Sequence, residues 1–168
     1  MTDDPKPEIQ YLTPPAGDAR VGPFGFLIVA KDFLDAANVL ATRYNDRSWV
    51  VPFLYCRAIE LALKAFLLAR GRQVGFVKKF GHDLNLLLIE AYAHGLDVVA
   101  ATTPEERASV IGWNNQYDEK ELEYFTMSPD LGPPSIANTT DLGSVALRLT
   151  KDIERGCKEA INGPYKPF

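Results

Sequence analysis

The residues between 54 and 91 restrict the fold of this chain more than any other part of the sequence. The first part of this segment reads LYCRAIELALKAFLLARG, and its aliphatic and aromatic side chains would surround a helix on nearly all sides. A helix of this composition is buried in the protein rather than laid on its surface. The sequence therefore predicts a central helix that begins after Ser48 and ends at Gly71, because glycine commonly follows the last turn of a helix.

Four further helices are predicted from apolar residues that recur at steps of three and four positions. They span about residues 23–44, 82–95, 103–125 and 140–162. The helix that begins after Thr103 has the strongest start signal, because the threonine is followed by a proline and two glutamates. The apolar face of the first predicted helix comprises Phe26, Val29, Ala30, Phe33, Ala37 and Leu40.

No segment alternates apolar and polar residues with the period of a strand, so no sheet is predicted. The expected fold is all-α, an up-and-down bundle of about five helices joined by short connections. Residues 23–163 make up the single domain of this prediction. Prolines among polar residues predict an extended or disordered arm at residues 1–22, and residues 164–168 are expected to be a C-terminal tail.

Composition narrows the class of protein. The net charge is −4 and the isoelectric point is near 5.2, which argues against a strongly basic nucleic-acid-binding protein but leaves room for a local basic patch. Cys56 and Cys157 fall on apolar helical faces and are expected to be buried, reduced thiols. The sequence contains no cluster of metal ligands and no glycine-rich phosphate loop, so no metal and no cofactor are predicted.

The same sequence gives expectations about location. No run reaches the roughly 18 apolar residues of a membrane span. The N-terminus, MTDDPKPEIQ, is acidic and proline-rich, unlike a signal peptide. A cytoplasmic protein without a membrane span is therefore expected.

A second pattern in the segment 54–91 links the central helix to the start of the next one. Its residues are Ala58, Glu60, Ala62, Leu63, Lys64, Ala65 and Leu67, then Gly71, then His82, Asp83 and Leu84. This pattern resembles the HEPN domain (higher eukaryotes and prokaryotes nucleotide-binding), in which an A-x-E-x-A-L-K-A-x-L helix precedes a loop and an H-D-L segment. The resemblance covers about residues 24–95. It implies a helical bundle that dimerises and that belongs to a prokaryotic defence or toxin–antitoxin type of system.

Many HEPN proteins are metal-independent ribonucleases, and their signature is an arginine followed four to six residues later by a histidine. This chain has two histidines, His82 and His94, and no arginine precedes either at that spacing. Because the signature is absent, the chain is expected to be a non-catalytic binding or scaffold module. Its expected partners are a second copy of the chain and either RNA, a nucleotide or a partner protein.

Charged residues on the central helix are the first candidates for a ligand site. Arg57, Glu60 and Lys64 are separated by three and four positions, so they share one helical face. On so apolar a helix these charges need water, partners or a ligand. They form either an anion-binding groove or a polar seam of internal ion pairs.

The loop after this helix adds Arg72, Lys78, Lys79 and His82. Cations contact phosphates, and histidine transfers protons near neutral pH. An alternative hypothesis is therefore a divergent metal-independent ribonuclease whose active site uses His82 with Lys78 and Lys79. In the structural alternative, His82 and Asp83 only start the next helix, where Asp83 caps free N–H groups.

An aromatic and amide stripe lies on the helix predicted at 103–125. It comprises Trp113, Asn114, Tyr117 and Tyr124. The stripe is expected either to pack against the bundle or to contact a second subunit, because aromatic residues serve both purposes. In a third hypothesis the protein acts only through protein–protein assembly, and this stripe is its dimer interface.

Overall fold

The computed structural model describes residues 22–44, 48–124 and 139–162, and within them all regular secondary structure is helical. The prediction of an all-α fold is confirmed for these residues. The elements are α1 (Pro23–Tyr44), α2 (Val50–Ala69), α3 (Val74–Val77), the 3₁₀ turn η1 (Lys78–Phe80), α4 (Leu84–Ala93), α5 (Leu96–Val99), α6 (Pro104–Asp118), α7 (Glu121–Tyr124), α8 (Thr139–Asp152) and α9 (Glu154–Asn162).

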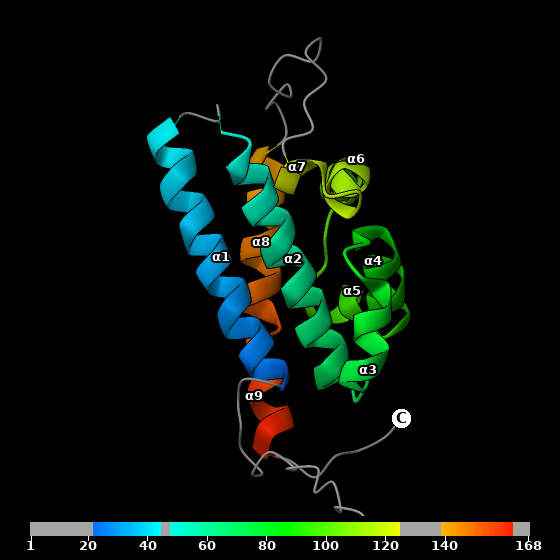
Figure 1. Cartoon of the computed structure of the whole chain (residues 1–168). Helices are drawn as coiled ribbons and strands as arrows, with labels where there is room; N and C mark the ends of the chain where they lie inside the picture. Colours follow the sequence, from blue (N-terminus) through cyan, green and yellow to red (C-terminus); the bar gives the residue numbers. More distant parts are fainter. Residues whose placement is uncertain (1–21, 45–47, 125–138, 163–168) are drawn as a thin grey trace, which may run out of the picture.

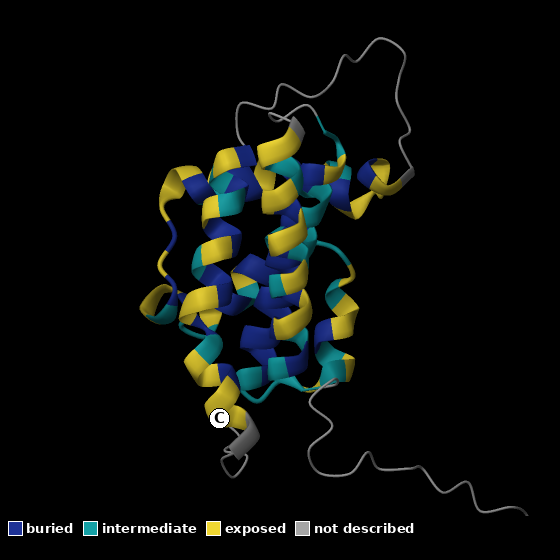
Figure 2. Ribbon diagram, turned by 90° about the vertical axis from the view of Figure 1, so that its left-hand side faces the viewer, coloured by how far each residue is buried: buried dark blue, intermediate teal, exposed yellow. Residues whose placement is uncertain are grey.

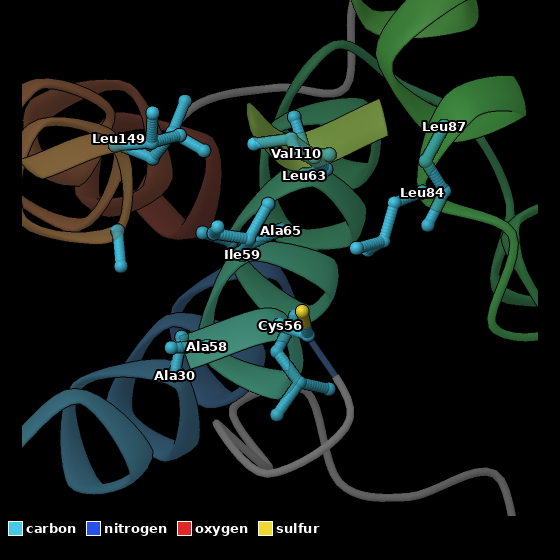
Figure 3. Close-up of a cluster of buried hydrophobic side chains, with 14 of the residues drawn as sticks. Ala30, Cys56, Ala58, Ile59, Leu63, Ala65, Leu84, Leu87, Val110 and Leu149 are labelled. Carbon is cyan, nitrogen blue, oxygen red and sulfur yellow. The ribbon is translucent and has the colours of Figure 1, made fainter. Parts of the chain in front are cut away.

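The helix α2 is the centre of the fold, as its apolar composition predicts. Every residue from Ala58 to Leu68 is buried. Figure 1 shows α2 between α1 on one side and α3, α4 and α5 on the other, with α8 packed behind it. In the core, Ile59 and Leu63 of α2 lie between Leu149 of α8 and Leu84 of α4 (Figure 3).

The outer helices bury one face and expose the other (Figure 2). In α1 the fully inward side chains are Leu27, Ala30, Leu34 and Ala37. Val29, which was predicted to face the core, is 44% exposed. The inner stripe is shifted to Leu27 and Leu34 on either side of Ala30, which packs beside Ala58 of α2, and two small residues at this contact let the helices approach closely (Figure 3).

The number of helices differs from the predicted five. The helix predicted at 103–125 ends early, because Lys120 adopts a positive φ of 61° that separates α6 from α7. The helix predicted at 140–162 is divided at Ile153 into α8 and α9, although hydrogen bonds from Ile153 to Leu149 and from Cys157 to Ile153 continue across the division. The predicted loop 72–81 contains α3 and η1, and α5 is an additional short helix.

The arrangement also departs from a simple up-and-down bundle at α6. Figure 1 shows α6 nearly end-on, whereas α1 and α2 run along the plane of the picture. The N-terminus of α6 is fixed by α8, because Arg148 donates to the carbonyl oxygen of Ala101 at 2.5 Å and pairs with Glu106 at 2.8 Å. These long-range contacts hold the N-terminus of α6 against α8.

Both cysteines are buried, as predicted, and both are free thiols. Burial is the main cause that raises the pKa of the Cys157 thiol to about 12, and Glu154 adds to it. Among the described helices, none is both long enough and apolar enough for a membrane crossing.

Candidate functional site

A buried carboxylate, Glu60 on α2, is the centre of the candidate site. Its side chain is 1% exposed and accepts hydrogen bonds from four groups. Arg57 Nη1 lies 2.8 Å from Oε2, Lys64 Nζ lies 2.5 Å from Oε1, and His82 Nδ1 lies 3.0 Å from Oε2. The hydroxyl of Tyr117 also donates to Oε2. We call these five residues the Glu60 cluster.

The helical repeat of α2 accounts for part of this cluster. Arg57, Glu60 and Lys64 project from one face because they are three and four positions apart. Lys64 also reaches beyond its own helix and donates to the carbonyl oxygen of Gly81 at 2.6 Å. Gly81 has a positive φ of 56°, which favours glycine, and it turns the chain from η1 toward α4. The turn places His82 beside Glu60.

The start of α4 is capped from two directions. Asp83 accepts a hydrogen bond from the backbone N–H of Leu86 at 2.9 Å, so the predicted capping role of Asp83 is confirmed. Asn114 of α6 accepts from the backbone N–H of Leu84 at 2.7 Å. Because α6 crosses the start of α4 in this way, Tyr117, one turn further along α6, reaches Glu60.

The electrostatics of the cluster favour a charged carboxylate. Burial would raise the pKa of Glu60, but the neighbouring ammonium of Lys64 and guanidinium of Arg57 hold it below its ordinary value. Burial, reinforced by Glu60, raises the pKa of Tyr117 well above its ordinary value. Glu60 is therefore an anion at neutral pH, and Tyr117 is a protonated donor to it.

The cluster reaches the surface through Arg57 and His82, whose side chains are each 29% exposed. The Arg57 guanidinium carbon also lies 6.0 Å from the centroid of the Phe33 ring. A carboxylate only accepts hydrogen bonds, so the contact with Glu60 assigns the proton to Nδ1 of His82. Among the described residues, Nε2 of His82 has no hydrogen-bond partner.

Three other predicted site residues are not part of the Glu60 cluster. Arg72 pairs with Glu90 at 2.8 Å, and its guanidinium carbon lies 4.7 Å from the centroid of the Phe76 ring. Lys78 and Lys79 are exposed on η1. Among the described residues, no hydrogen bond or ion pair joins either lysine side chain to the cluster.

Two aromatic residues of the predicted stripe, Trp113 and Tyr117, face the interior of the fold. Trp113 is 7% exposed and Tyr117 is 2% exposed. Asn114 caps α4, and the side chain of Tyr124 lies outside the described residues. A dimer interface at this stripe stays a prediction. The role of Tyr117 as a donor to Glu60 was not predicted, because 57 positions separate the two residues.

Comparison of the chain with protein-family models, curated proteins and solved structures gave no match. The resemblance to HEPN domains therefore depends on the residues of the central helix and of the His82-Asp83-Leu84 segment alone. In the part of the chain that the structure describes, no group of three or more histidine, cysteine, aspartate or glutamate side chains is arranged to hold a metal ion.

Proposed function

We propose that this chain is a non-catalytic, HEPN-like binding module that holds a phosphate-bearing ligand at the exposed edge of the Glu60 cluster. The observation that carries the proposal is the charge of the cluster. Arg57 and Lys64 both pair with the single carboxylate of Glu60. One positive charge is therefore in excess, and protonation of His82 would add a second.

The nearest carboxylate along the chain is engaged with the start of α4, and no ion pair joins it to Arg57 or His82 among the described residues. Asp83 is adjacent to His82, but its Oδ1 accepts from the N-terminus of α4. The partial positive charge of a helix N-terminus attracts a carboxylate in that position. The exposed edge of Arg57 and His82 thus has an unmatched attraction for an anion.

Phosphate suits the donors at this edge. A guanidinium carries five N–H donors in a planar fork that matches phosphate oxygens, and the contact with Glu60 engages Nη1 of Arg57. His82 adds a second donor when its ring is protonated. Lys78 and Lys79, exposed on η1 shortly before His82, supply cations for the further phosphates of a strand. RNA is the phosphate-bearing partner that the HEPN resemblance suggests.

The test is equilibrium binding of the purified full chain to a short labelled single-stranded RNA in a salt series. Affinity is expected to fall steeply between about 50 and 200 mM salt, because phosphate contacts release counterions. Replacement Arg57→Gln is expected to weaken binding by about ten- to a hundredfold, the effect of losing hydrogen bonds to a charged group.

Arg155→Gln is the matched control. It removes the same charge from α9, where the Arg155 side chain is 89% exposed and lies outside the Glu60 cluster. Its affinity for RNA is expected to equal that of the wild type. Absence of binding at low salt, or an equal loss in both variants, would contradict the proposal.

A second candidate function, a divergent metal-independent ribonuclease, is favoured by the contact between Glu60 and His82. The carboxylate orients the ring through Nδ1 at 3.0 Å, and the other ring nitrogen is then available for proton transfer. Its test is a denaturing gel of the same RNA samples. Replacement His82→Gln retains a donor toward Glu60 but cannot transfer a proton, so it is expected to abolish cleavage and keep the fold.

The wild-type protein decides between the two functions. RNA that is bound but not cut beyond the level of a mock purification would exclude the ribonuclease and support the binding module. RNA that is cut by the wild type but not by His82→Gln would establish the ribonuclease instead.

A further inference from the structure

A pocket of about 300 Å³ lies at the C-terminal end of α2 and shares no lining residue with the Glu60 cluster. Its apolar wall includes Phe66 of α2, Val99 of α5 and Ile153 between α8 and α9. Small-molecule sites combine apolar walls with a few polar groups, and this volume is at the lower end of their range. The pocket therefore fits a small molecule rather than a peptide or a nucleic-acid strand.

The cation of this pocket is Arg70, the residue that follows α2. Its guanidinium carbon lies 5.2 Å from the centroid of the Phe66 ring, and both residues line the pocket. Within the described part of the chain, the Arg70 side chain has no ion-pair partner. A guanidinium binds a carboxylate through two parallel hydrogen bonds, so Arg70 can hold the carboxylate of a ligand.

The pocket also has an acidic group, Asp152 at the end of α8. Among the described residues, Asp152 has no ion-pair partner either. Two further charged residues line the pocket, Arg155 and Glu159, but they lie 3.7 Å apart as an ion pair and their side chains are 89% and 71% exposed to solvent. One cation and one carboxylate are therefore left for a ligand.

We propose that this pocket binds a small apolar α-amino acid. The ligand carboxylate meets Arg70, its ammonium group meets Asp152, and its side chain packs on the wall of Phe66, Val99 and Ile153. A ligand with only one of the two charges leaves either Arg70 or Asp152 unmatched, which weakens its binding. The inference is independent of the phosphate-binding proposal, because the two sites have no residue in common.

The test is isothermal titration calorimetry of the full chain with L-phenylalanine and with L-leucine. At least one of them is expected to bind saturably at millimolar concentrations. Two derivatives of the bound amino acid each lack one charge, the N-acetyl derivative its ammonium group and the amide its carboxylate. Each is expected to bind at least about tenfold more weakly than the parent.

Gly156 provides a variant that blocks the pocket. It lines the pocket, and a Cβ atom added to it would meet no atom within 4 Å. The first atom of a new side chain therefore displaces no neighbour, and the longer side chain of Gly156→Leu is expected to occupy the pocket and abolish binding of the amino acid. Gly112→Leu is the control, because Gly112 on α6 is equally free of contacts and lies outside the pocket. The Gly112→Leu variant should bind the amino acid with the affinity of the wild type.

Single-charge variants test each contact. Arg70→Gln is expected to weaken binding of the amino acid at least about tenfold and to leave the weak binding of its amide unchanged. Asp152→Asn should likewise weaken binding of the amino acid and leave the weak binding of the N-acetyl derivative unchanged. Circular dichroism of each variant checks that the fold is kept.

Three outcomes would overturn the inference. They are no saturable binding of either amino acid, an N-acetyl derivative that binds as tightly as its parent, and a Gly156→Leu variant that still binds. Arg57→Gln should not change amino-acid binding, so failure at one site is distinguishable from failure at the other.

Discussion

Glu60 is the carboxylate that pairs with the positive charges of Arg57 and Lys64 inside the bundle. Its side chain is 1% exposed, and a buried carboxylate is costly unless charged and hydrogen-bonding partners surround it. The donors come from three places: α2 itself, the turn at His82, and α6 through Tyr117. One carboxylate therefore links three parts of the fold.

Glu60→Gln is expected to destabilise the protein by about 3–5 kcal/mol, the range for removing one partner of a buried ion pair. The variant leaves the ammonium of Lys64, whose side chain is 10% exposed, without a counter-charge. Urea denaturation followed by circular dichroism measures the loss of free energy of unfolding. The control is Glu159→Gln, where the carboxylate is 71% exposed and lies 3.7 Å from Arg155. A similar loss of free energy of unfolding in both variants would contradict the expectation that the burial of Glu60 increases its contribution to stability.

The contribution of Glu60 also depends on pH. Its folded-state pKa lies below the ordinary value of 4.5, because Lys64 and Arg57 outweigh the effect of burial. A lowered folded-state pKa stabilises the fold above the unfolded-state pKa, and this stabilisation disappears as the pH falls through the folded-state pKa. We therefore expect the stability difference between wild type and Glu60→Gln to shrink as the pH falls below about 4.5. A difference that stays constant, or grows, on acidification would contradict the lowered pKa.

Two glycines illustrate how an element is limited by its packing rather than by its helix propensity. A Cβ atom added to Gly143 of α8 would lie 3.1 Å from Cζ of Tyr55, whereas one added to Gly112 of α6 would meet no atom within 4 Å. Tyr55 cannot move freely, because it is 6% exposed and its hydroxyl donates to Asn38 at 2.9 Å. The close approach of α8 to α2 thus depends on glycine at position 143.

Alanine at the two positions should have different effects. Gly112→Ala is expected to raise the free energy of unfolding by about 0.5–1 kcal/mol, the usual gain from alanine within a helix. Gly143→Ala should lack this gain and lower the stability, because overpacking costs about 1–3 kcal/mol. Thermal denaturation of the two variants measures the contrast. An equal gain in stability in both variants would mean that the Tyr55 side chain moves aside without an energetic penalty.

Elements whose signal is local were predicted well from the sequence. The capping box of Thr103 and Glu106 begins α6, as its sequence indicates, and the apolar composition of α2 predicted the buried central helix. The division at Lys120 was not predicted, because a lysine carries no preference for the positive φ of 61° that it adopts. The helical turns of α3 and η1 are too short to show an apolar period.

At the scale of the whole molecule, the sequence predicted only the part of the site that lies on one helix. The spacing of Arg57, Glu60 and Lys64 predicted their shared face, and either ion pairs or a ligand were expected there. The structure contains the ion pairs, and a ligand at this face stays a prediction. That Tyr117 completes the cluster depends on how α6 crosses α4, which is a long-range contact without a local signal. For the same reason the inward orientation of the α6 aromatics was not decided by the sequence.

The whole chain is expected to open unevenly. Because α2 is buried from Ala58 to Leu68, its amides should exchange with solvent only when the molecule unfolds globally. By contrast, α9 is exposed over much of its surface, and Glu154 at its first position pairs with Lys31 of α1 at 2.7 Å. Native-state hydrogen exchange is therefore expected to show faster exchange in α9, through local opening of this helix.

The variant Lys31→Met should speed amide exchange in α9 a few-fold and leave exchange in α2 unchanged. Lys151→Met, on the exposed face of α8, is the control. Equal protection of α2 and α9 would show instead that α9 opens only with the whole molecule.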